Sequence, residues 1–416
     1  MNIGFISTRF AGTDGVSLEA QKWADVLASE GYSNYWFSGR SDRPDEISMV
    51  VPEANFQHPE NVWINDRVWG QTQRDTLITE RVESVSNYIK SKIRQFVDRF
   101  DIDVLILQNA LTIPIHIPLG VAITEFLAET GMPAVAHHHD FYWERIRFSI
   151  NAVPDFLDKA FPPRLPNLQH VVINSAAKEQ LALRRGVSAD VIPNVFNFEE
   201  PPVIGDAWAA DLREEIGLAP DDIFILQPTR VVPRKGIEHA IKLVASMDNP
   251  KAKLVISHDA GDEGYEYLEM LEYMAASEGI DLLNIADRIS ENRGYDEHGR
   301  KNYQLWDVYE HCDLVTYPSL IEGFGNAFLE AVYFKKPIVV NRYPIYIQDI
   351  ENKGFKVIAM DGYVSNETVL ETKKLLSDPT LIEEMVNENY RIASQHFSYQ
   401  SLLNSLQRAL RTNELV

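Results

Sequence analysis

The sequence predicts an α/β protein built from two doubly wound halves, and three observations support this fold class. Short apolar runs alternate with helical patterns along most of the 416 residues. The runs are almost continuously apolar, which is typical of strands in a parallel sheet that helices cover on both faces. Residues 192–208 interrupt the alternation with proline, asparagine and acidic side chains, so we place the boundary between the halves there.

The first half is expected to contribute four buried strands to one sheet. Their ranges are 2–8, 104–110, 133–140 and 170–176. Residues 17–31 carry apolar side chains at helical spacing and end at Gly31, which predicts a helix. Residues 42–74 show no clear period and are expected to form a long ordered loop or a small subdomain.

The second half repeats the alternation of strands and helices. Its expected strands are 223–229, 253–259, 281–287, 313–319 and 336–342. Residues 397–411 then form an amphipathic helical pattern. In open parallel sheets the carboxyl ends of the strands carry the ligand sites, so we look for functional residues directly after these strands.

Composition narrows the class of partner. The formal net charge is −22 and no run of lysine or arginine is present, which argues against a nucleic-acid partner. No window holds the roughly 18 unbroken apolar residues of a membrane helix, and the first residues enter an apolar strand without a signal-peptide pattern. The single cysteine, Cys312, reads as a core residue in a reducing compartment. We therefore expect a soluble cytoplasmic protein, and homo-oligomerisation is left open.

Two strand ends in the second half look suited to an anion. Gly323 and Gly325 lie between one expected strand and a helix over 326–336, and a helix that starts after a glycine turn presents unpaired N–H groups. Arg230 and Lys235 lie on the loop of another strand end, and two cations there suit a diphosphate. An acidic helix start and a solvated basic loop are the plain structural alternatives.

Glu322 and Glu330 flank the glycine turn and could look into the same crevice. Their spacing alone fits a catalytic acid/base pair, a ligand clamp or an ordinary solvated helix start. Near the N-terminus, Gly12, Thr13, Asp14 and Gly15 separate the first strand from the first helix. These residues lack the dinucleotide fingerprint and are a weak signal for close approach of a ligand.

Three consecutive histidines end the third expected strand. His137 and His139 would share one face, and His138 would point the other way. A metal site is conceivable there, but no further cluster with zinc spacing supports it. His137 fits a core histidine, whereas His139 at the strand end fits a hydrogen-bonding group or base. The aromatic and cationic residues that follow suit a sugar or an anionic group but also suit plain packing; they are Tyr142, Trp143, Arg145 and Arg147.

Together these residues resemble the retaining nucleotide-sugar glycosyltransferases of family 4. The strongest piece is the pair Glu322 and Glu330 in "PSLIEGFGNAFLEA", which is similar to that family's glutamate motif. "TRVVPRKG" is similar to its cationic loop, and "IPNVFN" to the end of its linker between domains. His139-Asp140 and the loop from Gly12 to Gly15 fall where the family has matching motifs. The resemblance covers most of the chain.

The resemblance implies the GT-B fold, in which two Rossmann-like domains face a central cleft. The implied division is an acceptor-side domain over 1–198, a donor-binding domain over 199–396 and a terminal segment over 397–416 whose helix crosses back to the first domain. Two departures stand out. Asn326 and Ala327 replace bulkier residues of many relatives, and the segment 286–311 is longer than usual, which affects the wall against the nucleotide base.

The resemblance also assigns roles. The implied catalytic residues are Glu322, His139, Arg230 and Lys235, and the implied contacts with the donor are Gly15, Arg230, Lys235, Glu322, Phe324, Gly325, Asn326 and Glu330. Glu322 and His139 would contact the transferred sugar, Glu330 the ribose, and the two cations with backbone N–H groups the diphosphate. The expected acceptor side comprises Asp14, Tyr142, Trp143, Arg145 and Arg147. No metal or other cofactor is expected, and Asp101 and Asp103 read as structural.

The expected reaction is transfer of a hexose from UDP- or GDP-hexose to a soluble hydroxyl acceptor, with retention of configuration. The acidic surface argues against a lipid acceptor and favours a small polar molecule or a sugar, and Arg145 and Arg147 suit one with a carboxylate or phosphate. The alternatives are a phosphorylase of the same fold, a glycosidase that uses Glu322 and Glu330, and a non-catalytic nucleotide-sugar binder.

Overall fold

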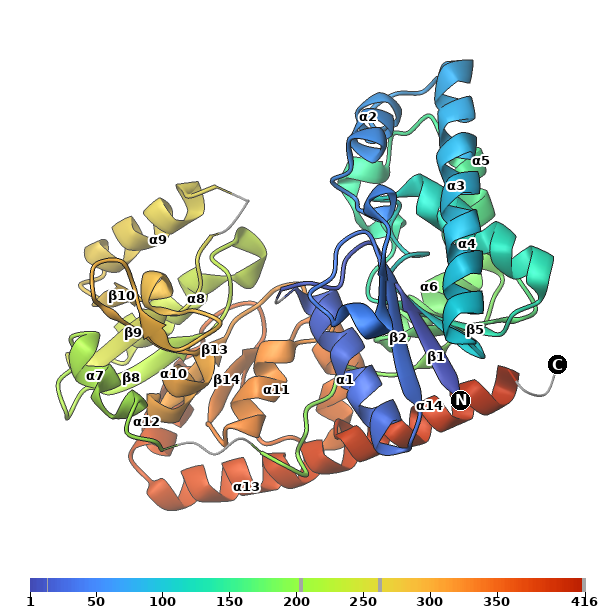
Figure 1. Cartoon of the computed structure of the whole chain (residues 1–416). Coiled ribbons are helices and arrows are strands. Elements are labelled where there is room, and N and C mark those ends of the chain that lie inside the picture. The colour runs from blue at the N-terminus through green and yellow to red at the C-terminus, as the bar shows by residue number, and fades with distance from the viewer. Residues whose placement is uncertain (13, 202–204, 261–263, 414–416) are drawn as a thin grey trace. The chain divides into compact units, whose positions relative to one another are not determined.

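The computed structural model describes residues 1–12, 14–201, 205–260 and 264–413. For residues 411–413 it describes the helical backbone but not the side chains. The described chain divides into two compact units, shown in Figure 1. Unit 1 is Met1–Asn194 together with the segment that begins at Tyr399, and unit 2 is Val195–Ser398. These borders lie four and two residues from the borders at 198 and 396 that the sequence suggested.

Unit 1 is built on a parallel sheet of seven described strands in the order β3-β2-β1-β4-β5-β6-β7. The strands are β1 (Asn2–Ile6), β2 (Ser33–Ser38), β3 (Ser48–Val50), β4 (Val104–Gln108), β5 (Ala134–His138), β6 (Leu168–Val172) and β7 (Asp190–Val191). All four strands expected in this half are present. The last of them ends earlier than expected, at Val172, because Asn174 already caps the next helix with its side chain.

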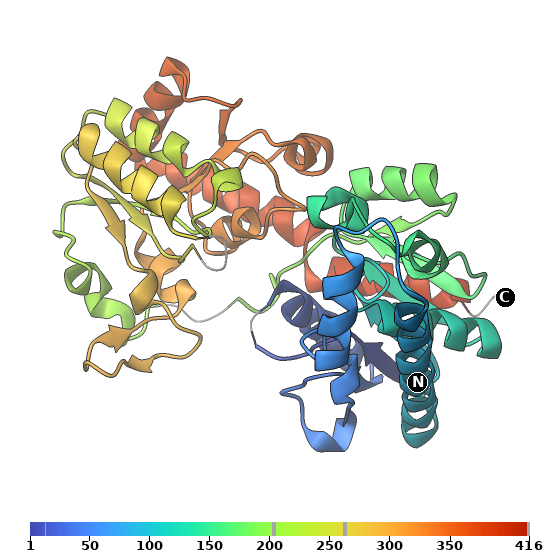
Figure 2. The same cartoon turned by 90° about the horizontal axis from the view of Figure 1, so that it is seen from above.

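Helices cover the sheet of unit 1. They are α1 (Gly15–Ser29), α2 (Pro59–Val68), α3 (Thr76–Phe100), α4 (Ile117–Thr130), α5 (Pro154–Ala160), α6 (Ser175–Arg185) and α14 (Tyr399–Asn413). Helices α3 and α4 lie side by side and contribute to a large buried apolar cluster, whereas α14 packs on α1, β5 and β6 (Figure 2). The aperiodic residues 42–74 contain β3 and α2.

Unit 2 is built on a parallel sheet whose described strands run in the order β10-β9-β8-β13-β14-β15. They are β8 (Ile223–Gln227), β9 (Ala252–Ile256), β10 (Leu282–Asn284), β13 (Leu314–Tyr317), β14 (Ile338–Asn341) and β15 (Ile358–Met360). The helices are α7 (Leu212–Glu215), α8 (Ile237–Ser246), α9 (Glu266–Ser277), α10 (Leu305–His311), α11 (Asn326–Tyr333), α12 (Asn366–Leu376) and α13 (Pro379–His396). A short antiparallel hairpin, β11 (Gly294–Tyr295) and β12 (Lys301–Asn302), occupies the long segment before α10.

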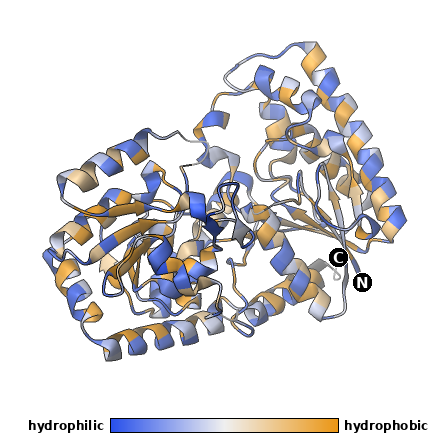
Figure 3. Cartoon of the chain, turned by 60° about the vertical axis from the view of Figure 1, so that its left-hand side comes forward, coloured by the Kyte–Doolittle hydropathy of each residue, from blue (hydrophilic) through white to orange (hydrophobic). Residues whose placement is uncertain are grey.

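Apolar strands form the centre of both units, as Figure 3 shows by hydropathy. Cys312 is buried, which confirms its reading as a core residue. Asp103 accepts a hydrogen bond from the backbone N–H of Asn2 at 2.7 Å, so this aspartate has a structural role, as expected. Among the described residues, no helix combines the length and the apolar character that crossing a membrane requires. The two parallel-sheet α/β units confirm the expected fold class.

Candidate functional site

The turn between β13 and α11 can be built only with glycine at its last position. Gly325 has φ 131°, a backbone conformation that residues with a side chain rarely adopt. A Cβ atom there would lie 2.2 Å from the hydroxyl of Tyr343. That hydroxyl donates a hydrogen bond to the carbonyl of Phe324 at 2.7 Å. The buried Tyr343 therefore holds the backbone turn that starts α11.

The cationic loop after β8 lies against the loop after β13, because these strands are neighbours in the sheet. The backbone N–H of Leu320 donates to the carbonyl of Arg234 at 2.9 Å. Gly236 has φ 60°, and a Cβ atom on it would lie 2.7 Å from the carbonyl oxygen of Pro318. The two strand ends that the sequence marked as anion sites thus form one continuous surface within unit 2.

Charged side chains of both loops meet on this surface. Lys235 is largely buried and forms an ion pair with Glu322, and the Arg234 guanidinium lies 3.6 Å from the other carboxylate oxygen. Burial lowers the pKa of Lys235, and the charge of Glu322 opposes this effect. Arg230 is exposed and forms no ion pair with any residue that the structure describes. The sequence identified Arg230 and Lys235 but not Arg234.

Each of the two glutamates lies beside a buried tyrosine. The hydroxyl of Tyr309 on α10 donates to Oε2 of Glu330 at 2.9 Å. Burial raises the pKa of Tyr317 at the end of β13, and the charge of Glu322 raises it further. Sequence reasoning missed both tyrosines, since their partners are distant in the chain or follow a turn whose course the sequence does not reveal.

The end of β9 adds a histidine to the same edge of the sheet. The backbone N–H of Val231 donates to the carbonyl of Asp259 at 3.2 Å, which ties the cationic loop to this strand end. Burial lowers the pKa of the neighbouring His258 to about 4, and the charges of Lys235 and Arg230 lower it further. The imidazole is therefore neutral at pH 7, and the local charge of the loop attracts an anion. Sequence analysis did not identify His258.

In unit 1 the loop before α1 is fixed by Asp14. Its carboxylate accepts hydrogen bonds from the backbone N–H groups of Val16 and Ser17 and pairs with Arg9 at 3.0 Å. Gly15 is the first residue of the helix. Thr13 lies outside the described residues. Asp14 is thus a helix cap, a structural role that the sequence had not assigned to it.

The three histidines at the end of β5 divide between the two faces, as expected. His138 lies 2.6 Å from the Thr112 hydroxyl and 3.0 Å from His170. On the other face, the ring centroids of His137 and His139 are 4.5 Å apart, and His137 hydrogen-bonds the Gln108 side chain at 2.9 Å. The packing confirms His137 as a buried core histidine.

His139 shares one feature with His137. In each imidazole the Nε2 atom is buried and has no hydrogen-bond partner among the described residues. Burial lowers the pKa of the His139 imidazole, and the nearby charges of Glu19, Asp140 and Asp14 oppose this effect. Glu19 on α1 is itself buried and pairs with Lys22 at 2.6 Å. The sequence did not single out Glu19, because it occupies an ordinary position in a helical pattern.

The aromatic and cationic residues after β5 have different surroundings. Trp143 stacks on Phe141 and donates its indole N–H to Gln180 at 2.9 Å, so much of it is packed. Tyr142 lies edge-on against Trp143. Arg145 pairs with Asp140, which lies directly after the histidines.

Arg147 differs from Arg145. Its guanidinium lies over the Phe148 ring at 4.4 Å and pairs with no carboxylate in the part of the chain that the structure describes. Burial and then the charge of Arg145 lower its pKa. Across the described residues, no three histidine, cysteine or acidic side chains are placed to hold a metal ion.

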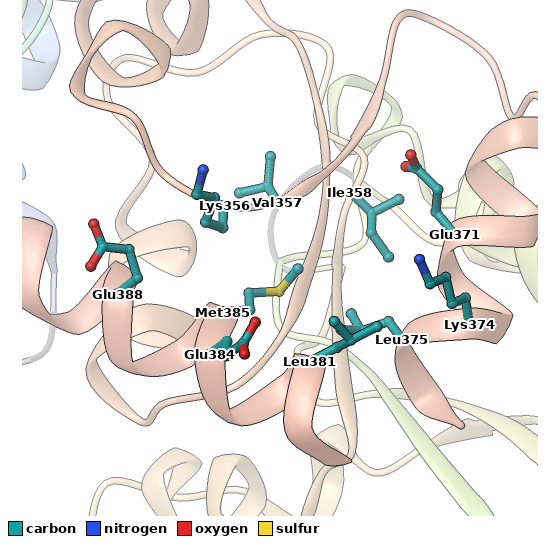
Figure 4. A pocket seen from close by; sticks show the side chains of 10 residues that line it. All are labelled: Lys356, Val357, Ile358, Glu371, Lys374, Leu375, Leu381, Glu384, Met385 and Glu388. Atoms are coloured by element: carbon teal, nitrogen blue, oxygen red, sulfur yellow. The ribbon is translucent and has the colours of Figure 1, made fainter. Parts of the chain in front are cut away.

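A cavity of about 450 Å³ lies elsewhere in unit 2, among the residues labelled in Figure 4. Ile358, the first residue of β15, and Val357 directly before it line the cavity together with side chains of α12 and α13. The loops described above follow the carboxyl ends of their strands, whereas this cavity adjoins the amino end of β15. Its rim combines two lysines with three glutamates around an apolar floor.

Comparison with known families and proteins gives a consistent result. Residues 209–392 match the family model described as glycosyl transferases group 1. The mannosylglucosylglycerate synthase of Thermotoga maritima is 30% identical, and the match covers 98% of this chain and 99% of that protein. The protein of the same name from Petrotoga mobilis is 32% identical over 88% of each chain.

Solved structures agree with the fold. Anabaena HepE in complex with UDP and glucose is 16% identical, with a TM-score of 0.66 over 99% of this chain and all of that one. A glycosyltransferase of Rickettsia africae is 12% identical, with a TM-score of 0.69 over 99% of this chain and 98% of that one. The extent of the match to the Thermotoga protein, the family model and the GT-B fold lead to one conclusion: the chain belongs to the group 1 glycosyltransferases.

Proposed function

We propose that this protein is a retaining glycosyltransferase that moves a hexose from UDP-hexose or GDP-hexose to a hydroxyl of a small soluble acceptor, without a metal. The observation that carries the proposal is the contact between two loops of unit 2. The cationic loop with Arg230 and Lys235 is hydrogen-bonded to the loop that leads into the glycine turn of α11. This arrangement suits the diphosphate of a nucleotide sugar.

The proposed donor contacts follow from this surface. Arg230 and Lys235 bind the diphosphate together with backbone N–H groups of residues 324–326, which lie at the start of α11. An ammonium group has three N–H donors, so Lys235 can keep Glu322 and also reach a phosphate oxygen. Glu322 contacts hydroxyls of the transferred sugar, and Glu330 accepts hydrogen bonds from the ribose.

The reaction then needs no protein nucleophile. The bond between the anomeric carbon and the diphosphate oxygen breaks, and the acceptor oxygen bonds to the same face of that carbon. The acceptor proton passes to the departing phosphate oxygen. Arg230 and Lys235 stabilise the charge that builds on the diphosphate, and preorganised charges of this kind are a large source of rate enhancement. Neither Glu322 nor Glu330 transfers a proton.

The acceptor is proposed from two lines of support. The two relatives that align over most of the chain are named mannosylglucosylglycerate synthases, so a mannosyl group and glucosylglycerate are a natural first donor sugar and acceptor to test. A glycerate carboxylate suits the guanidinium of Arg147, whereas Arg145 is already paired with Asp140. Contacts from Asp14, His139, Tyr142 and Trp143 to the acceptor or sugar remain proposals, as does a cytoplasmic location.

The experiment is a panel of mannose and glucose linked to UDP or GDP, incubated with glucosylglycerate, glycerate or 3-phosphoglycerate and with a chelator. We expect nucleoside diphosphate release that requires one acceptor and persists in the chelator. Nucleotide-sugar binding without product from any acceptor would point to a binding protein. Turnover only with inorganic phosphate would indicate a phosphorylase. Hydrolysis of simple glycosides, independent of Arg230 and Lys235, would indicate a glycosidase.

A further inference from the structure

We propose that Tyr309 is a positioning residue for donor recognition: its hydroxyl holds the Glu330 carboxylate in the orientation that receives the ribose hydroxyls of the nucleotide. This inference rests on the proposed function, because it takes Glu330 as the ribose contact. The tyrosine itself would touch no substrate. It would act through the carboxylate of a neighbouring helix.

The contact is well defined in the structure. Tyr309 is fully buried on α10, and its hydroxyl oxygen lies 2.9 Å from Oε2 of Glu330 on α11. The tyrosine ring stacks on Phe334, with ring centroids 5.2 Å apart and an angle of 14° between the planes. The backbone of α10 is held in turn, since the Lys336 ammonium donates to the carbonyls of Glu310 and Cys312. The hydroxyl is therefore a fixed donor.

Burial distinguishes the two residues of the pair. Glu330 is only partly buried, whereas Tyr309 is completely buried. An ionised carboxylate accepts several hydrogen bonds at once, so the bond from Tyr309 does not by itself exclude a ligand from Glu330. Burial, followed by the charge of Glu330, raises the pKa of Tyr309 well above its usual range. The hydroxyl thus stays protonated and remains a donor at every pH at which the protein would work.

A buried tyrosine bonded to a carboxylate can also be purely structural, and the chain supplies a matched example. Tyr303 is equally buried, and its hydroxyl lies 2.9 Å from Oδ1 of Asp211. Tyr303→Phe removes the same kind of hydrogen bond, of the same length, in the same unit. It therefore controls for the general cost of losing a buried hydrogen bond.

The test compares nucleotides with and without the ribose hydroxyls. Binding of GDP, UDP and their 2′,3′-dideoxy counterparts is measured by calorimetry for the wild type, Tyr309→Phe, Tyr303→Phe and Glu330→Gln. We expect Tyr309→Phe to weaken binding of the preferred ribonucleotide about 10-fold, the scale of losing one hydrogen bond between the ribose and the charged Glu330. Binding of the dideoxynucleotide should change less than about 2-fold. Tyr303→Phe should leave the ratio of the two affinities unchanged.

The outcomes separate the inference from the proposed function. Equal weakening of both nucleotides by Tyr309→Phe, or a full ribose preference in that variant, would overturn the positioning role. If neither the wild type nor Glu330→Gln distinguishes the ribose, the assignment of Glu330, and with it this part of the proposed function, is wrong. In the Glu330→Gln background, Tyr309→Phe should add no further loss of ribose preference.

A second variant tests the same proposal if Tyr309→Phe does not fold. Should Tyr309→Phe prove unstable, Tyr309→Met places at this position a flexible apolar side chain that adapts to irregular core space and has no hydroxyl donor. It should show the same selective loss of ribose preference. A Met variant that binds the ribonucleotide like the wild type contradicts the proposal.

Discussion

At the scale of single residues, the contact between Lys235 and Glu322 is the most informative. The two belong to different loops, and the ion pair lies in a largely buried position, where a charge without a partner is costly. Lys235 therefore both binds Glu322 and brings a positive charge to the proposed phosphate site. This double role explains why a lysine and a glutamate so far apart in the sequence belong to one site.

Replacing either proposed phosphate ligand should therefore slow transfer strongly. Arg230→Ala and Lys235→Ala are each expected to lower kcat/KM for the nucleotide sugar by about 100-fold or more, the scale of losing one charge-stabilising donor. Steady-state kinetics with the active donor and acceptor measures this. Lys253→Ala removes a lysine paired with Asp281 in the same unit and serves as the control. Near-normal rates in both Arg230→Ala and Lys235→Ala contradict the assignment.

The turn before α11 gives a second prediction at this scale. Gly325→Ala introduces a Cβ atom 2.2 Å from the Tyr343 hydroxyl in a conformation that alanine rarely adopts. Backbone strain and overcrowding together should lower the free energy of unfolding by about 2–5 kcal/mol and disrupt donor binding. Gly31→Ala also places alanine at a positive φ, of 82°, but in open space, so it should cost only about 1 kcal/mol. Chemical denaturation measures the free energy of unfolding of both variants. Equal losses would contradict the conclusion that the turn before α11 requires glycine at position 325.

The residues that the sequence could and could not predict differ in a physical way. Glu322, Glu330, Arg230 and Lys235 follow apolar strands directly, so local spacing reveals them. Tyr309, His258 and Arg234 were missed, because their relevance depends on which loops and helices become neighbours in the folded sheet. The sequence assigned no capping role to Asp14 for a related reason: capping depends on where α1 begins, and that boundary differed by two residues from the expected one.

At the scale of elements, unit 1 contains several buried histidines whose pKa values lie below the usual range. Burial lowers the pKa of His170 on β6 to about 4, and burial also lowers the pKa of His138, to which His170 is hydrogen-bonded. Burial lowers the pKa of His116, the cap of α4, to about 4 as well. These groups release protons on folding, since an exposed histidine titrates near 6.5.

The stability of unit 1 should consequently depend on pH. Because the unfolded chain binds more protons than the folded one between about pH 6.5 and 4, the free energy of unfolding falls as the pH falls through this window. On going from pH 7 to pH 5, His116 and His170 should each lower the free energy of unfolding by about 2 kcal/mol. Urea denaturation at both pH values measures the change. His170→Gln should reduce the pH dependence, and an unchanged slope in this variant would refute the account.

Hydrophobic periodicity predicted some secondary-structure elements and missed others. The expected strands are all present, yet β2 and β15 were not predicted, and residues 42–74 conceal β3 and α2. Strand β2 and residues 42–74 mix polar and aromatic residues with apolar ones, so they lack a strong period, whereas β15 is apolar but only three residues long. Strand β2 is recognisable only from its pairing with β1, a contact between residues about 30 positions apart. Elements with a strong local pattern could therefore be predicted from the sequence. Elements such as β2, which are defined by pairing with a strand distant in the sequence, could not.

At the scale of the whole molecule, the chain combines a strongly acidic composition with a locally cationic surface in unit 2. A net charge of −22 disfavours non-specific binding of nucleic acid, whereas Arg230, Arg234 and Lys235 gather on one loop. The contrast suits an enzyme that recognises a small anionic donor. The sequence could place this loop in the second unit, but the identity of base, hexose and acceptor depends on side-chain surroundings that composition does not reveal.

The anomeric configuration of the product tests the central claim most directly. Glucosylglycerate is incubated with the α-linked mannose donors GDP-mannose and UDP-mannose, and the new linkage is followed by proton NMR from the first turnovers. We predict an α-mannosyl product together with a stoichiometric amount of nucleoside diphosphate. A β-linked product would contradict retention, and the absence of a glycosidic product across all donors and acceptors of the panel would contradict hexosyl transfer itself.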